Sequence, residues 1–149
     1  MTTKTTTAPT PKNRRKTWTE KREINKQPEV KVSDKDFADI KAGEKMLIAT
    51  PQVVDEYIRQ IPRGKHVSLS TLRNDLAMEY HADKTCPVTS GIFLRIVSEA
   101  AYEEYQQGKP LSKITPFWRV VAIGSPTAKK LTFGTDFLQA QQKKEGITS

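Results

Sequence analysis

The sequence predicts an α+β fold, mostly helical, that follows a flexible basic N-terminal arm. Residues 1–36 are rich in Thr, Lys, Pro and charge, and they lack the apolar side chains of a core. Three helical patterns follow, of which the third is the longest. After them, the β-branched run "WRVVAIG" is separated by a turn from the strand-like "LTF". Two short helices, a longer third helix and a small β-wing are typical of a winged-helix (helix-turn-helix) domain over residues 37–149, which presents its third helix to DNA.

The charge of the chain favours a polyanionic partner. The 149 residues carry a formal net charge of +8, and residues 1–36 hold 10 Lys/Arg against 5 Asp/Glu, which is more than half of the excess. Within this arm, Arg14, Arg15 and Lys16 could contact phosphates, and Trp18 could stack on a base. The alternative is a solubilising tail that contacts nothing specific.

Several classes of protein are not expected. Cys86 is the one cysteine, so no disulfide can form within the chain. No apolar run approaches the roughly 20 residues that span a bilayer, and the first residues do not resemble a secretory signal. Two histidines and one cysteine are too few for a typical structural zinc site. We therefore expect a cytoplasmic protein with no cofactor, no metal and no membrane partner.

The first helices follow from apolar spacing and capping residues. Residues 36–46 could form a short helix with an apolar side, which Gly43 would weaken. The next helix is expected to begin at Pro51, after Thr50 as N-cap, and to end at Pro62. A brief strand could lie in "KHVSLS".

Two further helices complete the helical part of the predicted domain. One covers residues 70–81, with Ser70 as its cap, and its apolar residues recur at i, i+4 and i+8. The longest covers residues 91–107, with Thr89 or Ser90 as its cap. Beyond the predicted wing, residues 135–146 form a final helix that ends at a glycine.

Four segments occur in the order known from one family. They are "IPRGKHVSLSTL", "LRIVSEA", "KPLSKITPFWRVV" and "FGTDFLQAQQKKEG", and the strongest match is Pro116, two residues, then Arg119-Val120-Val121. From Thr50 to Gly146 the chain resembles the alkylguanine-DNA alkyltransferase family, and more closely its alkyltransferase-like branch. The resemblance implies a DNA-repair protein that binds double-stranded DNA, plain or alkylated at guanine, with a repair protein as a further partner.

The resemblance also implies that the chain transfers no alkyl group. The family's nucleophilic cysteine directly follows the proline, and its next residue is a histidine that works with a later glutamate. Here these positions hold Phe117 and Trp118, and Glu145, which matches the glutamate, would have no histidine to serve. The alkyltransferase-like branch lacks the cysteine too and binds alkylated guanine without reacting.

Site residues follow from the same alignment of motifs. Pro116, Phe117 and Trp118 are expected to wall a pocket for an extruded base. The alternative is that the two rings pack in the core. Arg95 aligns with the arginine that the family inserts into the duplex in place of the flipped base, and the alternative is a surface pair with Glu99.

Two other residues complete the expected DNA contacts. Ser68 belongs to the "VS" motif, and Arg119 either meets phosphate or supports its own loop. At the position after that motif, where the family has a tyrosine, this chain has Leu69. Glu99, Glu103 and Glu104 give the third helix a net negative charge, which disfavours phosphate.

Two alternative functions therefore stay open. The chain could be a protein-interaction module that keeps the fold and has lost DNA binding. It could also be an enzyme that uses Cys86, because a helix that begins after this residue would lower the pKa of its thiol.

Overall fold

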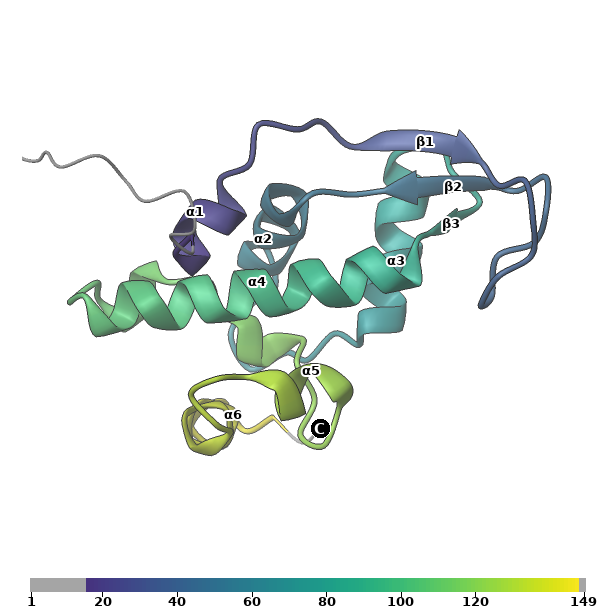
Figure 1. Ribbon diagram of the computed structural model, residues 1–149. Coiled ribbons are helices and arrows are strands. Elements are labelled where there is room, and N and C mark those ends of the chain that lie inside the picture. Colours follow the sequence, from purple (N-terminus) through teal and green to yellow (C-terminus); the bar gives the residue numbers. More distant parts are fainter. Residues whose placement is uncertain (1–15, 148–149) are drawn as a thin grey trace, which may run out of the picture.

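The computed structural model describes residues 16–147 and confirms an α+β fold. Figure 1 shows a long helix, α4, crossing the middle of the molecule, with α1, α2 and a small sheet on one side and α5 and α6 on the other. These elements do not establish a winged-helix domain. The helices and strands are α1 (Trp18–Arg22), β1 (Glu29–Val32), β2 (Lys45–Ile48), α2 (Pro51–Arg59), α3 (Leu69–Glu79), β3 (Lys84–Thr85), α4 (Pro87–Gln106), the 3₁₀ turns η1 (Leu111–Lys113) and η2 (Phe117–Arg119), α5 (Pro126–Lys130) and α6 (Asp136–Glu145).

The described part of the expected arm, residues 16–36, is structured. Thr17 and Glu20 form a reciprocal capping box at the start of α1, so even this five-residue helix has its first amides satisfied. Further on, β1 pairs antiparallel with β2, with Glu29 opposite Ile48. The arm prediction was wrong here because these residues bury few side chains of their own and are held by contacts with distant segments.

The sheet has the order β1-β2-β3, with β2 and β3 parallel. The short helix expected over residues 36–46 is absent, and that prediction was wrong: turns and an isolated bridge occupy most of this segment, and the central strand β2 begins at Lys45. Ala38 and Gly43 adopt positive φ angles of 49° and 92°, which a helix does not allow. In strand β2 Leu47 is fully buried, its neighbours Met46 and Ile48 are half-buried, and Lys45 at the end of the strand is exposed.

The helices of the predicted domain are confirmed, with shifts at their N-termini. Helix α2 begins at Pro51 with the Thr50 hydroxyl accepting from the Val53 amide, as expected. The cap of α3 is Ser68 and not Ser70. Helix α4 begins at Pro87, four residues before the expected start, because a proline at the first helical position needs no amide partner. Gly146 ends α6 in the left-handed conformation.

The predicted β-wing is absent from the described residues. Phe117–Arg119 is a 3₁₀ turn, "SPTAKK" contains α5 instead of a turn, and Leu131–Phe133 forms no strand. The Gln142 side chain donates to the carbonyls of Trp118 and Val121 at 3.0 and 2.8 Å. Gln142 bonds two carbonyls of this run, and the amides of Val67 and Ser125 bond those of Arg119 and Ala122, so these four carbonyls have partners without a neighbouring strand.

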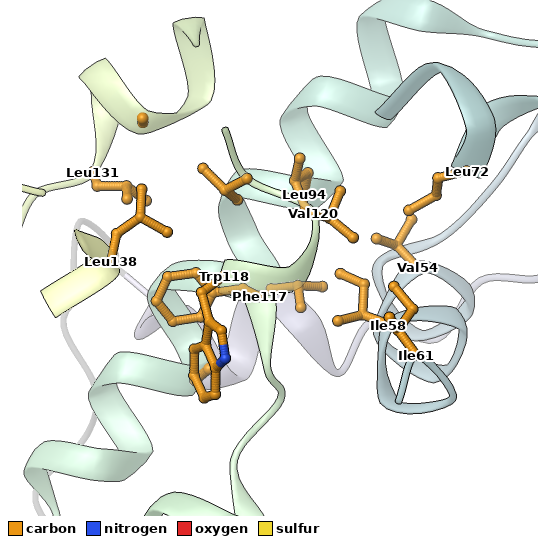
Figure 2. Packing of buried hydrophobic residues seen from close by; sticks show 14 of the residues in the cluster. Val54, Ile58, Ile61, Leu72, Leu94, Phe117, Trp118, Val120, Leu131 and Leu138 are labelled. Carbon is orange, nitrogen blue, oxygen red and sulfur yellow. The ribbon is translucent and has the colours of Figure 1, made fainter. Parts of the chain in front are cut away.

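One hydrophobic core joins these elements. Buried side chains of α2, α3 and α4 meet the loop after η1, and Figure 2 shows Phe117 and Trp118 between residues of α2 and the α5–α6 region. The labelled members of this core are Val54, Ile58, Ile61, Leu72, Leu94, Phe117, Trp118, Val120, Leu131 and Leu138.

Candidate nucleic-acid interface

Phe117 and Trp118 are core residues, which corrects the prediction that they wall a base pocket. Phe117 is 0% exposed and Trp118 is 3% exposed, and the preceding Pro116 is buried as well. The two rings meet edge to face with centroids 5.4 Å apart, and both pack against Phe137. A base could reach these rings only after the core had opened.

Glu145 organises the loop that contains both rings. Its carboxylate accepts the indole N–H of Trp118 at 2.7 Å, two guanidinium N–H groups of Arg119 at 2.9 Å each, and the Gly64 amide at 2.9 Å. The expectation that this glutamate has nothing to serve is therefore wrong, because the indole that stands at the histidine position also carries an N–H donor.

The environment of Glu145 keeps it ionised. Burial raises the pKa of Glu145, but the hydrogen bonds from Arg119, Gly64 and Trp118 outweigh burial and lower the pKa to about 2. Arg119 is committed to this pair and to the Ile61 carbonyl, at 2.7 Å. Its side chain supports the loop, so the expected phosphate contact by Arg119 does not fit the structure.

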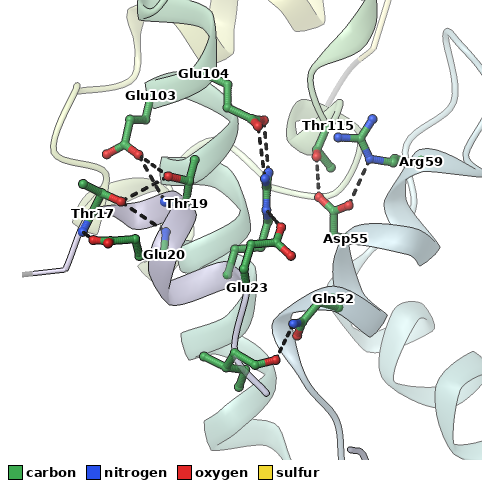
Figure 3. Close-up of polar contacts among 12 residues, drawn as sticks. Thr17, Thr19, Glu20, Glu23, Gln52, Asp55, Arg59, Glu103, Glu104 and Thr115 are labelled. Carbon is green, nitrogen blue, oxygen red and sulfur yellow. Dashed lines mark hydrogen bonds and ion pairs between the residues drawn. The ribbon is translucent and has the colours of Figure 1, made fainter. Parts of the chain in front are cut away.

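The carboxylates of α4 are occupied inside the protein. Glu103 caps α1 by accepting the amides of Trp18 and Thr19, at 3.2 and 3.1 Å, and Figure 3 shows its contact with Thr19. Glu104 forms a bidentate ion pair with Arg22, whose two terminal guanidinium nitrogens donate to the two carboxylate oxygens at 3.0 and 3.1 Å.

Glu99, one turn earlier on α4, is also used internally. It is buried and accepts from the backbone amide and the hydroxyl of Thr132. The three carboxylates that argued against DNA thus have partners within the chain. Glu99 is buried and Glu104 is paired with Arg22, whereas Glu103 is half-buried and, among the described residues, accepts only from neutral donors.

Arg95 lies beside Trp18. Its guanidinium carbon is 5.1 Å from the centre of the Trp18 ring, and its Nε is 3.9 Å from a Glu99 oxygen and has no hydrogen-bond partner among the described residues. The side chain is 34% exposed. The expected alternative, a pair with Glu99, is therefore present only as a long contact, and the aromatic ring is the second neighbour that positions the charge.

A groove runs along α4 at this point, and we call it the Trp18 groove. It has a volume of about 550 Å³. Its ten lining residues come from α1, α4 and α5 and include three basic side chains and no carboxylate: Trp18, Lys21, Val88, Gly91, Ile92, Arg95, Ile96, Pro126, Thr127 and Lys130.

A second, smaller cavity adjoins the first, and we call it the His66 pocket. It has a volume of about 290 Å³ and shares Gly91, Pro126 and Thr127 with the Trp18 groove. Its lining is mostly apolar and consists of His66, Ser68, Leu69, Pro87, Gly91, Leu94, Val120, Val121, Ala122, Ser125, Pro126 and Thr127.

His66 is the titratable group of this pocket. Burial lowers the pKa of His66, and nearby carbonyls of Val120 and Val121 offset this only in part, so the ring is neutral at neutral pH. Its Nε2 has no hydrogen-bond partner among residues 16–147. A buried ring nitrogen without a partner leaves one hydrogen bond available to a ligand.

The structure brings together only some of the predicted site residues. Ser68 lines the His66 pocket, although its hydroxyl also caps α3. Lys16 is exposed, whereas Arg14 and Arg15 lie outside the described residues. Cys86 is 6% exposed at the start of α4 and lines neither cavity.

Sequence reasoning missed most of the residues that line the two cavities. His66 and Lys130 carried no motif of their own, and Lys21 lay in a segment expected to be unstructured. Trp18 was singled out as a stacking residue, but its neighbour Arg95 is distant in sequence. Leu69 was noted only as the replacement of a tyrosine, and it lines the His66 pocket.

No protein-family model, curated protein or solved structure matches the chain. The resemblance to the alkyltransferase-like branch therefore stays a prediction from motifs. None of the helices in residues 16–147 combines the length and the apolar character needed to cross a bilayer. Within the same residues, no group of three or more His, Cys, Asp and Glu side chains is placed to hold a metal ion.

Proposed function

We propose that this chain is a cytoplasmic DNA-binding protein of the alkyltransferase-like type. It holds guanine, plain or alkylated, from duplex DNA without transferring the alkyl group, and it serves DNA repair together with a further repair protein. The observation that supports this proposal is the His66 pocket, an apolar cavity that adjoins the basic, exposed side of α4 through Gly91.

The His66 pocket, rather than the loop rings, receives the extruded base. Its volume of about 290 Å³ gives room for about ten water molecules at about 30 Å³ each, and so for one purine ring system. Leu69, Val120 and Val121 offer apolar walls against which the faces of a flipped base can pack. The free Nε2 of neutral His66 can bond to the base edge.

Arg95 supports the same proposal from the neighbouring side of α4. A guanidinium can fill the space that an extruded base leaves and can donate to the orphaned partner base. Arg95 has a hydrogen-bonding nitrogen without a partner and a side chain that is one-third exposed. Of the three carboxylates of α4, only Glu99 forms an ion-pair contact with Arg95, at the long distance of 3.9 Å, so the charge of Arg95 is offset only in part.

Alkyl transfer is not part of the proposal. The position that follows Pro116 carries a hydrocarbon ring, which has no lone pair with which to accept an alkyl group. Cys86, the alternative nucleophile, is buried beside neither cavity. After incubation with DNA that contains O6-methylguanine, mass spectrometry is expected to show no adduct on the chain, and an adduct on Cys86 would establish the enzyme instead.

The main test is a fluorescence anisotropy titration with two labelled duplexes of the same sequence, one plain and one with a single O6-methylguanine. We expect both to bind, and the alkylated duplex to bind more tightly. Arg95→Ala is expected to weaken both by about 10- to 100-fold. Negligible binding of the unchanged chain to both duplexes would refute the proposal.

The pocket itself is tested by filling it. Leu69→Trp places a large ring in the His66 pocket from a half-buried position and should remove the preference for the alkylated duplex. Met78→Trp is the matched control, because it introduces the same ring at an exposed position of the same helix, outside both cavities. A preserved preference in Leu69→Trp would place the base elsewhere.

The second candidate function is a protein-interaction module. Its first support, the acidic third helix, disappears because the carboxylates are internally paired. One specific observation still favours it: β1 is an edge strand with Val30 and Val32 exposed, which is a surface on which another chain can add a strand. Failure of the DNA titration would make this the leading function.

A further inference from the structure

The Trp18 groove is a second site beside the base pocket, and the motif resemblance does not account for it. Two of its walls, Trp18 and Lys21, come from a segment that precedes the region resembling the alkyltransferase family. We infer that this groove binds the nucleotide next to the extruded one, with its phosphate among Lys21, Arg95 and Lys130. The inference rests on the proposed function and extends it to a contact with the DNA strand.

Charge is the first argument. The groove is lined by three cationic side chains and no carboxylate. One carboxylate oxygen, from buried Glu99, lies 3.9 Å from Arg95 and offsets part of its charge. Lys21 and Lys130 have no ion pair among the described residues, so their charges are available to a phosphate.

The aromatic ring at the groove is the second argument. The Nζ of Lys21 lies 4.2 Å from the centre of the Trp18 ring, and Arg95 lies 5.1 Å from it. The ring therefore holds two cations in place before any ligand arrives. Held side chains lose less freedom on binding, so the groove is arranged for an anion in advance.

The apolar part of the groove fits the rest of a nucleotide. Val88 and Ile92 lie one turn apart on α4 and are 59% and 51% exposed, although both are large apolar side chains. Sugar and base faces are apolar surfaces that such residues can cover. A free inorganic anion would need no such wall, so the combination favours a nucleotide over a bare phosphate.

Gly91 is the third argument, because it lies at the wall that both cavities share. It sits inside a helix, where glycine is less stable than alanine, and it has no positive φ that would require glycine. A methyl group there would meet no described atom within 4 Å other than those of the adjacent residues and the backbone of its own helix turn. The protein's own packing does not call for glycine here, whereas close approach of a strand that passes from one cavity to the other does.

The test measures how binding of the plain and the alkylated duplex depends on salt. Removing one phosphate contact lowers the slope of log K against log salt concentration by about 0.9. Lys130→Gln and Lys21→Gln are each expected to lower the slope by about this amount on both duplexes. Lys129→Gln is the matched control, because it removes the same charge from the adjacent exposed position of α5, which does not line the groove.

A second variant separates binding from folding. Gly91→Ala is expected to raise the melting temperature by about 2–4 °C, because it improves the helix, and to weaken binding of both duplexes at least threefold. A purely structural position would show the first effect without the second. If affinity in Gly91→Ala is unchanged, the strand does not pass over this residue and the inference fails.

The outcomes distinguish this inference from the proposed function. If the unchanged chain binds DNA and Leu69→Trp removes its preference, but Lys21→Gln and Lys130→Gln behave like Lys129→Gln, the groove is not a nucleotide site and only the proposed function stands. If the unchanged chain binds neither duplex, both fail. If the slope of log K against log salt concentration falls in Lys21→Gln and Lys130→Gln but not in Lys129→Gln, the result supports nucleotide binding in the groove.

Discussion

Replacing Glu145 by Gln should make the stability of this protein depend less on pH. The variant keeps the size and one oxygen of the side chain but removes the charge that faces Arg119. The pKa of Glu145 falls from its usual 4.5 to about 2 in the folded protein, and this difference corresponds to about 3 kcal/mol of folding free energy. An independent figure agrees, since breaking a buried ion pair costs about 3–5 kcal/mol.

The direction of the pH effect follows from the lowered pKa. A carboxyl group that is more acidic in the folded state contributes its full stabilisation above about pH 5, and the contribution is lost as the pH falls from 4.5 towards 2. The difference in unfolding free energy between the unchanged protein and Glu145→Gln should therefore be about 3 kcal/mol at pH 7 and should shrink steadily below about pH 4.5.

Urea denaturation at several pH values between about 7 and 2.5 measures this difference directly. Glu79→Gln serves as the control, because the same chemical change at an exposed position of α3 should alter stability by less than about 0.5 kcal/mol. A difference for Glu145→Gln that stays constant over the whole pH range would refute the reasoning, since it would show that packing and not charge carries the effect.

Four further predictions test the core and the N-terminal helix. Phe117→Ala should lower the unfolding free energy by about 3–5 kcal/mol in the same urea assay, and a loss below about 1 kcal/mol would contradict its place in the core. Trp118→Phe should cost about 2–4 kcal/mol, because it removes the hydrogen bond to Glu145 and leaves a cavity where the larger indole packed. Hydrogen bonds to Glu104 raise the pKa of Arg22 and hold α1 on α4. Arg22→Gln should therefore speed amide hydrogen exchange in α1 and leave exchange in α2 unchanged. Equally faster exchange in both helices would indicate global destabilisation instead. Cys86 should react with a thiol reagent only as fast as the protein unfolds, and rapid labelling of the native protein would contradict its burial.

The helices with local signals were predictable from the sequence. Helix α2 has a proline preceded by a threonine cap, and α6 ends at a glycine in the left-handed conformation. Such signals act within a few residues, so they do not depend on contacts with distant parts of the chain. The start of α4 was missed because Pro87 was not considered as a first helical residue.

The sheet and the wing were not predictable in the same way. Val120 and Val121 favour a strand by composition, but a strand also needs a partner for its backbone groups. Gln142, more than 20 positions later, supplies those hydrogen bonds and removes the need for one. Strand β1 pairs with β2, whose first two residues were assigned to the end of the expected helix, and pairing of this kind depends on contacts that no local pattern contains.

The candidate site shows the same division between local and distant information. The motif alignment pointed to the loop at Pro116 and to Arg95, and the structure places cavities beside Arg95 and beside the residues that follow the loop. It could not indicate that Trp118 and Phe117 face inward, because burial of an aromatic ring is decided by what packs on it. The motif alignment also could not predict that Trp18 and Arg95, which are far apart in the sequence, lie side by side.

The packing of α1 against α4 affects the electric charge of the surface that α1 covers. The amides of this helix and Arg22 occupy Glu103 and Glu104, which otherwise would face solvent next to the basic groove. Proteolytic trimming of the chain up to residue 22 would remove Lys21 and Arg22 and leave Glu103 without its amide donors, while Glu104 would keep its pair with Lys109. The groove would lose a cation beside a newly exposed carboxylate and would attract a polyanion less, so the first helix makes the electrostatic character of this face depend on whether residues 16–22 are in place.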